Sequence, residues 1–252
     1  MTIRYVLALG VVAALAFAPQ RALAQTPAPA PPPPPPGWTG SFGAGLAVTS
    51  GNSDTSSTNI GYDVLRDYGT DVVFKSTGVY LRGSNSGTSN VDRSGADARL
   101  EYKLSPRLAA FGMTTYARDR FKAIDYLVAP TVGLSYKVVV TPTTEWSVDG
   151  SVGVVSEKDT GLDVKTNGAF IAGERFAHKF NDRTKFLHAA TGLWKMGAFD
   201  DAFYTFSAGV VTAVASRFDL KAEFLNSYKN KPSNPLLKKS DQSIVMSVVY
   251  KF

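Results

Sequence analysis

Two histidines, His178 and His188, are the first residues to test for catalysis, because the chain contains no cysteine. Hydrolysis by a serine nucleophile needs a nearby histidine as base and a third polar group that orients the histidine. His178 begins the run His-Lys-Phe-Asn-Asp beside a predicted turn, and His188 lies between Leu187 and Ala189 in a predicted strand. Neither begins the His-x-Ser arrangement that we associate with an outer-membrane phospholipase. Packing is the favoured role for both, and the sequence predicts no catalytic residue.

Carboxylates in predicted loops are the second group of candidates, because calcium takes six to eight oxygen ligands. None of these loops has the ligand spacing of a known calcium motif, so solvated acids are the favoured interpretation. The Gly43-Ala-Gly45 segment lies within a predicted strand with no helix after it, so it is not a dinucleotide-binding fingerprint. We therefore predict no metal and no cofactor. The loop carboxylates are Asp119, Asp125, Glu157, Asp159, Asp163, Asp200 and Asp201.

The elements that position these residues are β-strands, because apolar residues recur with a period of two from Trp38 onward. The predicted strands are 38–50, 55–67, 71–83, 92–104, 107–118, 125–138, 144–156, 164–177, 184–194, 203–214, 217–227 and 241–252. An all-β fold follows, with about twelve antiparallel strands of a length suited to crossing a membrane.

One face of most predicted strands is small, polar or charged, and the other is apolar. A soluble sandwich would also alternate. Aromatic residues at strand ends, Trp38, Tyr102, Tyr136 and Phe252, instead favour a membrane interface. Since lipid cannot satisfy an open sheet edge, we predict a closed transmembrane β-barrel. The candidate lumen-lining residues are Lys75, Asp97, Arg99, Glu101, Glu145, Asp149, Arg175, Lys221 and Glu223.

An even number of strands would put both termini at one end of the barrel. The short connections 67–71, 104–107 and 214–217 would lie at that periplasmic end. Longer connections near 83–92, 118–125, 156–164, 195–202 and 228–240 would face outward, which is the usual outer-membrane asymmetry.

The N-terminal 37 residues carry the features of export. Arg4 precedes an apolar run, and Ala22-Leu-Ala24 forms a cleavage site, so 1–24 is predicted as a signal peptide. Residues 25–37 are predicted as a proline-rich periplasmic linker, for which a spacer is favoured over a ligand for an envelope partner. The barrel domain is then 38–252.

The net charge of +6 comes from basic residues that are scattered along the chain. A nucleic-acid-binding surface would gather them on one face, so no nucleic-acid partner is predicted. One predicted outer loop does hold four lysines, which could pair with lipopolysaccharide phosphates, although a solvated loop is favoured. These are Lys229, Lys231, Lys238 and Lys239.

The last strand alternates apolar residues and ends on an aromatic residue, with Val248, Tyr250 and Phe252 on one face. This end resembles the signal by which the barrel assembly machinery recognises its clients. The segments Trp38-Thr-Gly-Ser-Phe-Gly-Ala-Gly and Tyr116-Ala-Arg-Asp-Arg-Phe resemble the salt-induced outer-membrane protein family, a family of unknown function. The resemblance covers 38–252, except that the proline tract departs from it. It implies an outer-membrane barrel, with no catalytic residues.

These features predict an integral protein of the cell outer membrane, in contact with lipid and lipopolysaccharide. The expected function is a narrow pore for small polar solutes or ions, linked through the family resemblance to salt or envelope stress. A non-conducting structural barrel that contacts lipopolysaccharide is the alternative. An outer-membrane lipid hydrolase ranks below both.

Overall fold

The computed structural model describes residues 37–50, 55–85 and 88–252. The predicted signal peptide and all of the predicted linker except Gly37 lie outside the described residues. Within them, twelve strands form one closed antiparallel barrel in which each strand pairs with its neighbours in sequence and β1 pairs with β12. The strands are β1 (Gly37–Ser50), β2 (Thr55–Asp67), β3 (Val72–Asn85), β4 (Thr88–Lys103), β5 (Leu108–Asp119), β6 (Ile124–Val140), β7 (Thr144–Asp159), β8 (Lys165–Lys179), β9 (Thr184–Lys195), β10 (Ala198–Ala213), β11 (Phe218–Lys229) and β12 (Ser240–Lys251).

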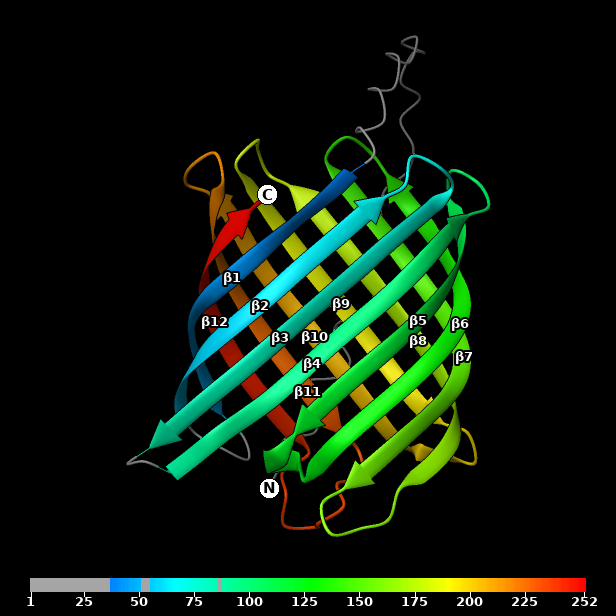
Figure 1. The fold of residues 1–252 in the computed structure, drawn as a ribbon, viewed down its shortest axis with the longest axis vertical. Helices are drawn as coiled ribbons and strands as arrows, with labels where there is room; N and C mark the ends of the chain where they lie inside the picture. Colours follow the sequence, from blue (N-terminus) through cyan, green and yellow to red (C-terminus); the bar gives the residue numbers. More distant parts are fainter. Residues whose placement is uncertain (1–36, 51–54, 86–87) are drawn as a thin grey trace, which may run out of the picture. The chain divides into compact units, whose positions relative to one another are not determined.

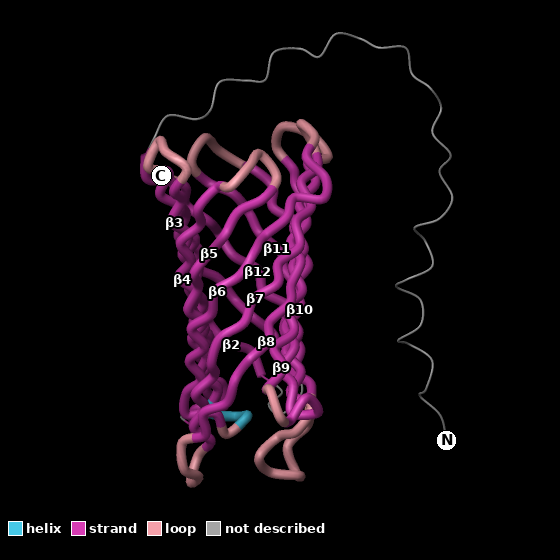
Figure 2. Tube along the Cα trace, turned by 90° about the vertical axis from the view of Figure 1, so that its right-hand side faces the viewer, coloured by secondary structure: helices cyan, strands magenta, loops and turns pink. Residues whose placement is uncertain are grey.

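The predicted fold class, the closed antiparallel barrel, is confirmed (Figure 1). The start of β1 and Phe252 lie at the same end, as an even number of strands requires; we call this end the terminal rim and the opposite end the distal rim. The one short helix of the described residues, η1 (Arg120–Lys122), joins β5 to β6 at the distal rim (Figure 2). In the described part of the chain, no helix combines the length and the apolarity that a membrane span requires.

The predicted difference between short and long connections is mostly wrong. Among the described connections of the distal rim, 196–197 is as brief as the turns of the terminal rim, and only 230–239 is long. Strands β3, β4 and β10 continue into segments predicted as loops, because ladder hydrogen bonds between paired backbones do not require alternating apolar side chains.

The alternating faces resolve into an apolar outside and a mixed inside. Leu46, Val132 and Met246 are 69%, 64% and 62% exposed, whereas Ala47 and Val245, their sequence neighbours, are buried. Because successive strand side chains point to opposite faces, the exposed set lines the outer surface, as contact with lipid requires.

Aromatic residues gather on the outer face towards both rims. Trp38, Tyr102, Tyr136 and Phe252 are exposed at the terminal rim. Towards the distal rim, Trp194 packs edge-on against Tyr204, its indole nitrogen donating to the Tyr204 hydroxyl at 3.1 Å. Amphipathic rings with satisfied polar groups suit the two interfaces of a membrane.

The seam between β1 and β12 closes the barrel. Phe42 stands opposite Tyr250, and the Phe42 ring stacks on Phe252 with centroids 5.6 Å apart. Gly40 and Phe252 exchange backbone hydrogen bonds of 3.1 Å, and a Cβ on Gly40 would lie 2.7 Å from the Phe252 ring. The C-terminal aromatic residue predicted as an assembly signal therefore lies at the seam, next to a position that only glycine accommodates.

Candidate functional site: the barrel lumen

Register shows which charged residues face inward. Lys75 stands directly opposite Arg99, which is buried, and directly opposite residues share a face. The same argument places Asp97, Glu101, Asp149, Arg175, Lys221 and Glu223 on the inner face. Glu145 has the same parity but lies at the terminal rim, where its 55% exposed side chain pairs with Lys137 at 3.5 Å.

A network that we call the terminal charge layer joins four strands: Lys75 of β3, Arg99 and Glu101 of β4, Asp149 of β7 and Arg175 of β8. The Arg99 guanidinium donates to Glu101 at 2.6 Å and to both Asp149 oxygens at 3.1 and 3.3 Å. Since β5 and β6 separate β4 from β7 in the barrel, this bidentate pair bridges non-neighbouring strands inside the lumen.

Two lysines and an arginine on the inner face of the terminal half keep contact with solvent. Lys75 binds Glu101 at 2.8 Å with 40% of its side chain exposed, and Arg175 binds Asp149 at 2.7 Å with 44% exposed. Lys221 binds Glu223 at 2.8 Å and is 30% exposed. Charged groups with this exposure on the inner face border space that water can enter.

Two further inward groups, Asp63 and Lys185, were absent from the predicted lining. Both are exposed, and Asp63 feels the charges of Lys221, Lys185 and Lys75. Counting every second residue along each strand could have found them. Lys185 shares the inner face of β9 with Leu187, and Asp63 stands opposite Thr77, an inward residue of β3.

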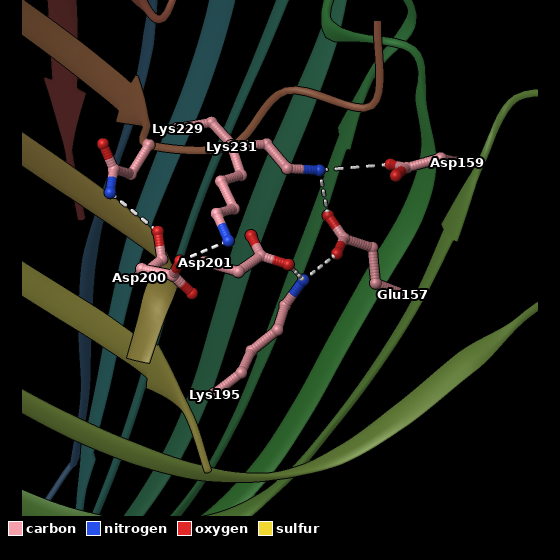
Figure 3. A network of polar contacts seen from close by, with 8 residues as sticks. Glu157, Asp159, Lys195, Asp200, Asp201, Lys229 and Lys231 are labelled. Atoms are coloured by element: carbon pink, nitrogen blue, oxygen red, sulfur yellow. Dashed lines mark hydrogen bonds and ion pairs between the residues drawn. The ribbon is translucent and has the colours of Figure 1, made fainter. Parts of the chain in front are cut away.

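The distal half of the lumen holds a second network, the distal ion-pair cluster, formed by Glu157, Asp159, Lys195, Asp201 and Lys229 (Figure 3). Glu157 accepts from Lys229 at 2.6 Å and also pairs with Lys195. The Lys195 ammonium also pairs with Asp201 at 2.7 Å, and the Lys229 ammonium also pairs with Asp159 at 3.2 Å. The side chains of Glu157, Lys195 and Lys229 are only 5%, 7% and 4% exposed.

Lys122 of η1 contacts β11 and β12 across the distal mouth. Its ammonium donates to the backbone oxygen of Ser227 at 2.8 Å and to the Ser227 hydroxyl at 3.0 Å, and pairs with Asp241 at 3.4 Å. Strands β11 and β12 lie on the opposite wall from β5 and β6 in the strand order. The inward-turned η1 and its Lys122 side chain together therefore bridge the two walls.

Local structure explains why Lys122 turns inward. Asp119 caps η1 by accepting from the backbone nitrogens of Phe121 at 3.1 Å and Lys122 at 3.2 Å, and Ala123 takes a left-handed conformation with φ of 56°. Burial lowers the pKa of the Lys122 ammonium, whereas the carboxylates of Asp241 and Asp119 act to raise it. The ammonium gives up hydration that its fixed partners replace.

Apolar side chains fill much of the wall behind these ion pairs. The buried cluster comprises Ile124, Leu127, Ala129, Val155, Ala169, Ile171 and Leu193, with Ala117 and Phe203 packed against it. Most of these residues belong to β6–β9, at inward positions of their distal halves. Partly exposed charged side chains thus line the lumen towards the terminal rim, whereas buried ion pairs and apolar side chains fill it towards the distal rim.

The four lysines predicted to contact lipopolysaccharide do not form one exposed set. For Lys229 the prediction is wrong, because its ammonium is buried inside the barrel between Glu157 and Asp159. Lys231 is 58% exposed and pairs with Asp200, and Lys239 donates to Asn230 at 3.3 Å. Lys238 lies in the connection 230–239 and also has interaction partners.

Each histidine makes polar contacts with neighbouring side chains or backbone within the described residues. His188 contacts Glu174 at 3.1 Å and the backbone oxygen of Ser207 at 3.0 Å, and His178 contacts the Thr144 hydroxyl at 2.8 Å. Glu174 also accepts from the Trp146 indole at 3.0 Å, forming a polar group on the outer face that sequence reasoning missed. Within the described ranges, no group of three or more histidines and carboxylates is placed to hold a metal ion.

Comparison with known families and structures places the chain in a class. Residues 42–252 match the family described as "Protein of unknown function, DUF481", and the chain belongs to this family. No curated protein matches the sequence.

Solved structures show the same fold at low identity. The NanC porin is 11% identical with a TM-score of 0.57, covering 84% of this chain and 100% of the porin. The translocator domain of the autotransporter NalP from Neisseria meningitidis is 11% identical with a TM-score of 0.52, covering 86% and 88%. The fold is therefore that of a cell outer-membrane β-barrel.

Proposed function

We propose that this protein is a narrow outer-membrane channel for small polar solutes or ions, entered from the periplasm through the terminal half of the lumen. The observation that carries the proposal is the set of exposed inward charges in that half: Asp63, Lys75, Arg175, Lys185 and Lys221. A barrel of about twelve strands lies between small filled barrels and wide porins, so its side chains decide whether solute passes. The shared fold with the NanC porin supports a channel class.

The mixture of charges argues for weak selectivity. Four of the five exposed inward charges are positive, and Asp63 and the partly buried Glu223 offset part of them, so the walls that water reaches should favour anions only weakly. A small ion would exchange part of its hydration for these groups at low cost, whereas a large apolar solute would not. At the distal end, passage requires that the buried ion pairs separate.

Planar-bilayer recording of the purified protein tests the proposal. Wild-type protein should give small single-channel steps, and Lys185→Glu should shift the reversal potential in a salt gradient towards cation selectivity. Lys239→Glu is the matched control, because it makes the same change of charge in the long distal connection 230–239. A silent bilayer with folded, heat-modifiable protein would reject the channel.

The alternative is a structural barrel without conduction, which the buried distal ion-pair cluster favours. The silent bilayer is its expected result. A role in salt or envelope stress stays a proposal for either function, tested by whether a deletion strain loses viability at high salt.

A further inference from the structure

Three arginines lie around Asp92 near the distal rim of the barrel. Arg82 is exposed on β3 between Leu81 and Gly83, which are both buried, so its side chain points outward. It stands opposite Asp92 of β4, which therefore shares the outer face. Arg118 of β5 follows Ala117, a residue packed against the inner apolar cluster, and so also faces outward.

Asp92 forms ion pairs with two of these arginines. The Nη1 atoms of Arg118 and Arg120 each lie 3.5 Å from a different Asp92 oxygen, and the Asp92 side chain is 15% exposed. Arg118 and Arg120 are 37% and 60% exposed, so both side chains keep access to solvent. One carboxylate among three guanidiniums leaves an excess of positive charge on this surface, which we call the arginine patch (Arg82, Arg118 and Arg120).

The depth of the patch suits the headgroup layer of the outer leaflet. Tyr80 and Tyr116 precede Arg82 and Arg118 by two residues on the same face, each nearer the barrel centre, and are 38% and 36% exposed. Along β3 and β5, tyrosine and then arginine thus succeed one another towards the distal rim, as interface residues do.

We propose that the arginine patch binds a phosphate group of lipid A, the membrane anchor of lipopolysaccharide. A guanidinium presents planar paired donors that match phosphate oxygens bidentately, and several of them around one site suit a multiply charged anion. Lipid A carries such phosphates on its sugars at the depth of this patch, in the leaflet that the distal rim faces. The site lies outside the lumen and does not depend on conduction.

Binding of purified protein to diphosphorylated lipid A in mixed micelles tests this site. Arg82→Gln/Arg118→Gln/Arg120→Gln should weaken binding by at least tenfold, since a charge-assisted hydrogen bond contributes about 1.5–3 kcal/mol. The matched control is Arg107→Gln/Arg183→Gln/Arg217→Gln, which removes the same charge from exposed arginines in the turns of the terminal rim. It should bind as wild type does.

Three results would overturn the proposal: unchanged affinity of the patch variant, equal affinity for dephosphorylated lipid A, or equal affinity for phosphatidylglycerol. The last would show a general anionic preference. If the triple variant fails to fold, Asp92→Asn gives the opposite test, because removing the competing carboxylate should tighten binding several-fold. Weaker binding by folded Asp92→Asn would also reject the site.

Discussion

The two halves of the lumen use the same residue types to different effect. Lys75 and Arg175 in the terminal charge layer are 40% and 44% exposed, whereas Lys122 and Lys229 near the distal rim are 3% and 4% exposed. Water screens the first set, and packed side chains surround the second. An exposed ion pair of the terminal half should therefore act on solutes that enter with water, whereas the buried pairs of the distal half block the mouth.

The largest expected effect comes from breaking the distal ion-pair cluster. Glu157→Gln leaves the buried ammonium groups of Lys195 and Lys229 short of one negative charge, which should lower the free energy of unfolding by about 3–5 kcal/mol. Glu223→Gln, in the terminal half, should cost less than about 1 kcal/mol, because its partner Lys221 is 30% exposed. Urea unfolding in phospholipid vesicles measures both, and equal losses would contradict the difference between the halves.

The packed distal wall should show the next largest effect. Ile171→Ala removes a side chain that is 5% exposed within the apolar cluster, and the cavity should cost about 2–4 kcal/mol. Leu65→Ala, at an inward and half-buried position opposite Lys75, should cost less. The same unfolding assay compares them, and a larger loss for Leu65→Ala would mean that the terminal half is the better packed.

Opening the distal mouth should be measurable by chemical labelling, because the natural chain has no cysteine. Val155→Cys places a thiol at a fully buried inward position behind the mouth. Adding Lys122→Ala should speed its reaction with a methanethiosulfonate reagent about tenfold, since charge-assisted hydrogen bonds that hold η1 across the mouth are lost.

Lys103→Ala is the control for the labelling experiment, because Lys103 pairs with Asp67 at 3.8 Å at the terminal rim. It should leave the rate unchanged. Equal acceleration by both changes would show that reagent reaches the thiol by general loosening of the barrel.

The smallest effect should follow from Lys75→Met in the terminal charge layer. The exposed pair with Glu101 should contribute under about 1 kcal/mol, and less as salt is raised. Unfolding at low and high ionic strength measures this. A loss that is large and independent of salt would place Lys75 with the buried distal residues.

Sequence reasoning found the strands well and the interactions of their side chains poorly. Strand β2 has the predicted bounds 55–67, whereas β10 begins at Ala198, five residues before the prediction. Glu157 and Lys195 were assigned to loops, although both belong to strands and face inward. The distal ends of these strands lack the apolar alternation on which the prediction depended, so the charged residues there could not be assigned to a face.

The sequence by itself determined the period of two, the number of strands and the apolar outer face, because each follows from local alternation along one strand. Only the tertiary structure decided which charges meet. Lys122 and Asp241 lie on opposite walls, and Arg99 reaches Asp149 past two intervening strands. Such pairs depend on barrel closure and on the inward turn of η1, which bring together residues that no local pattern relates.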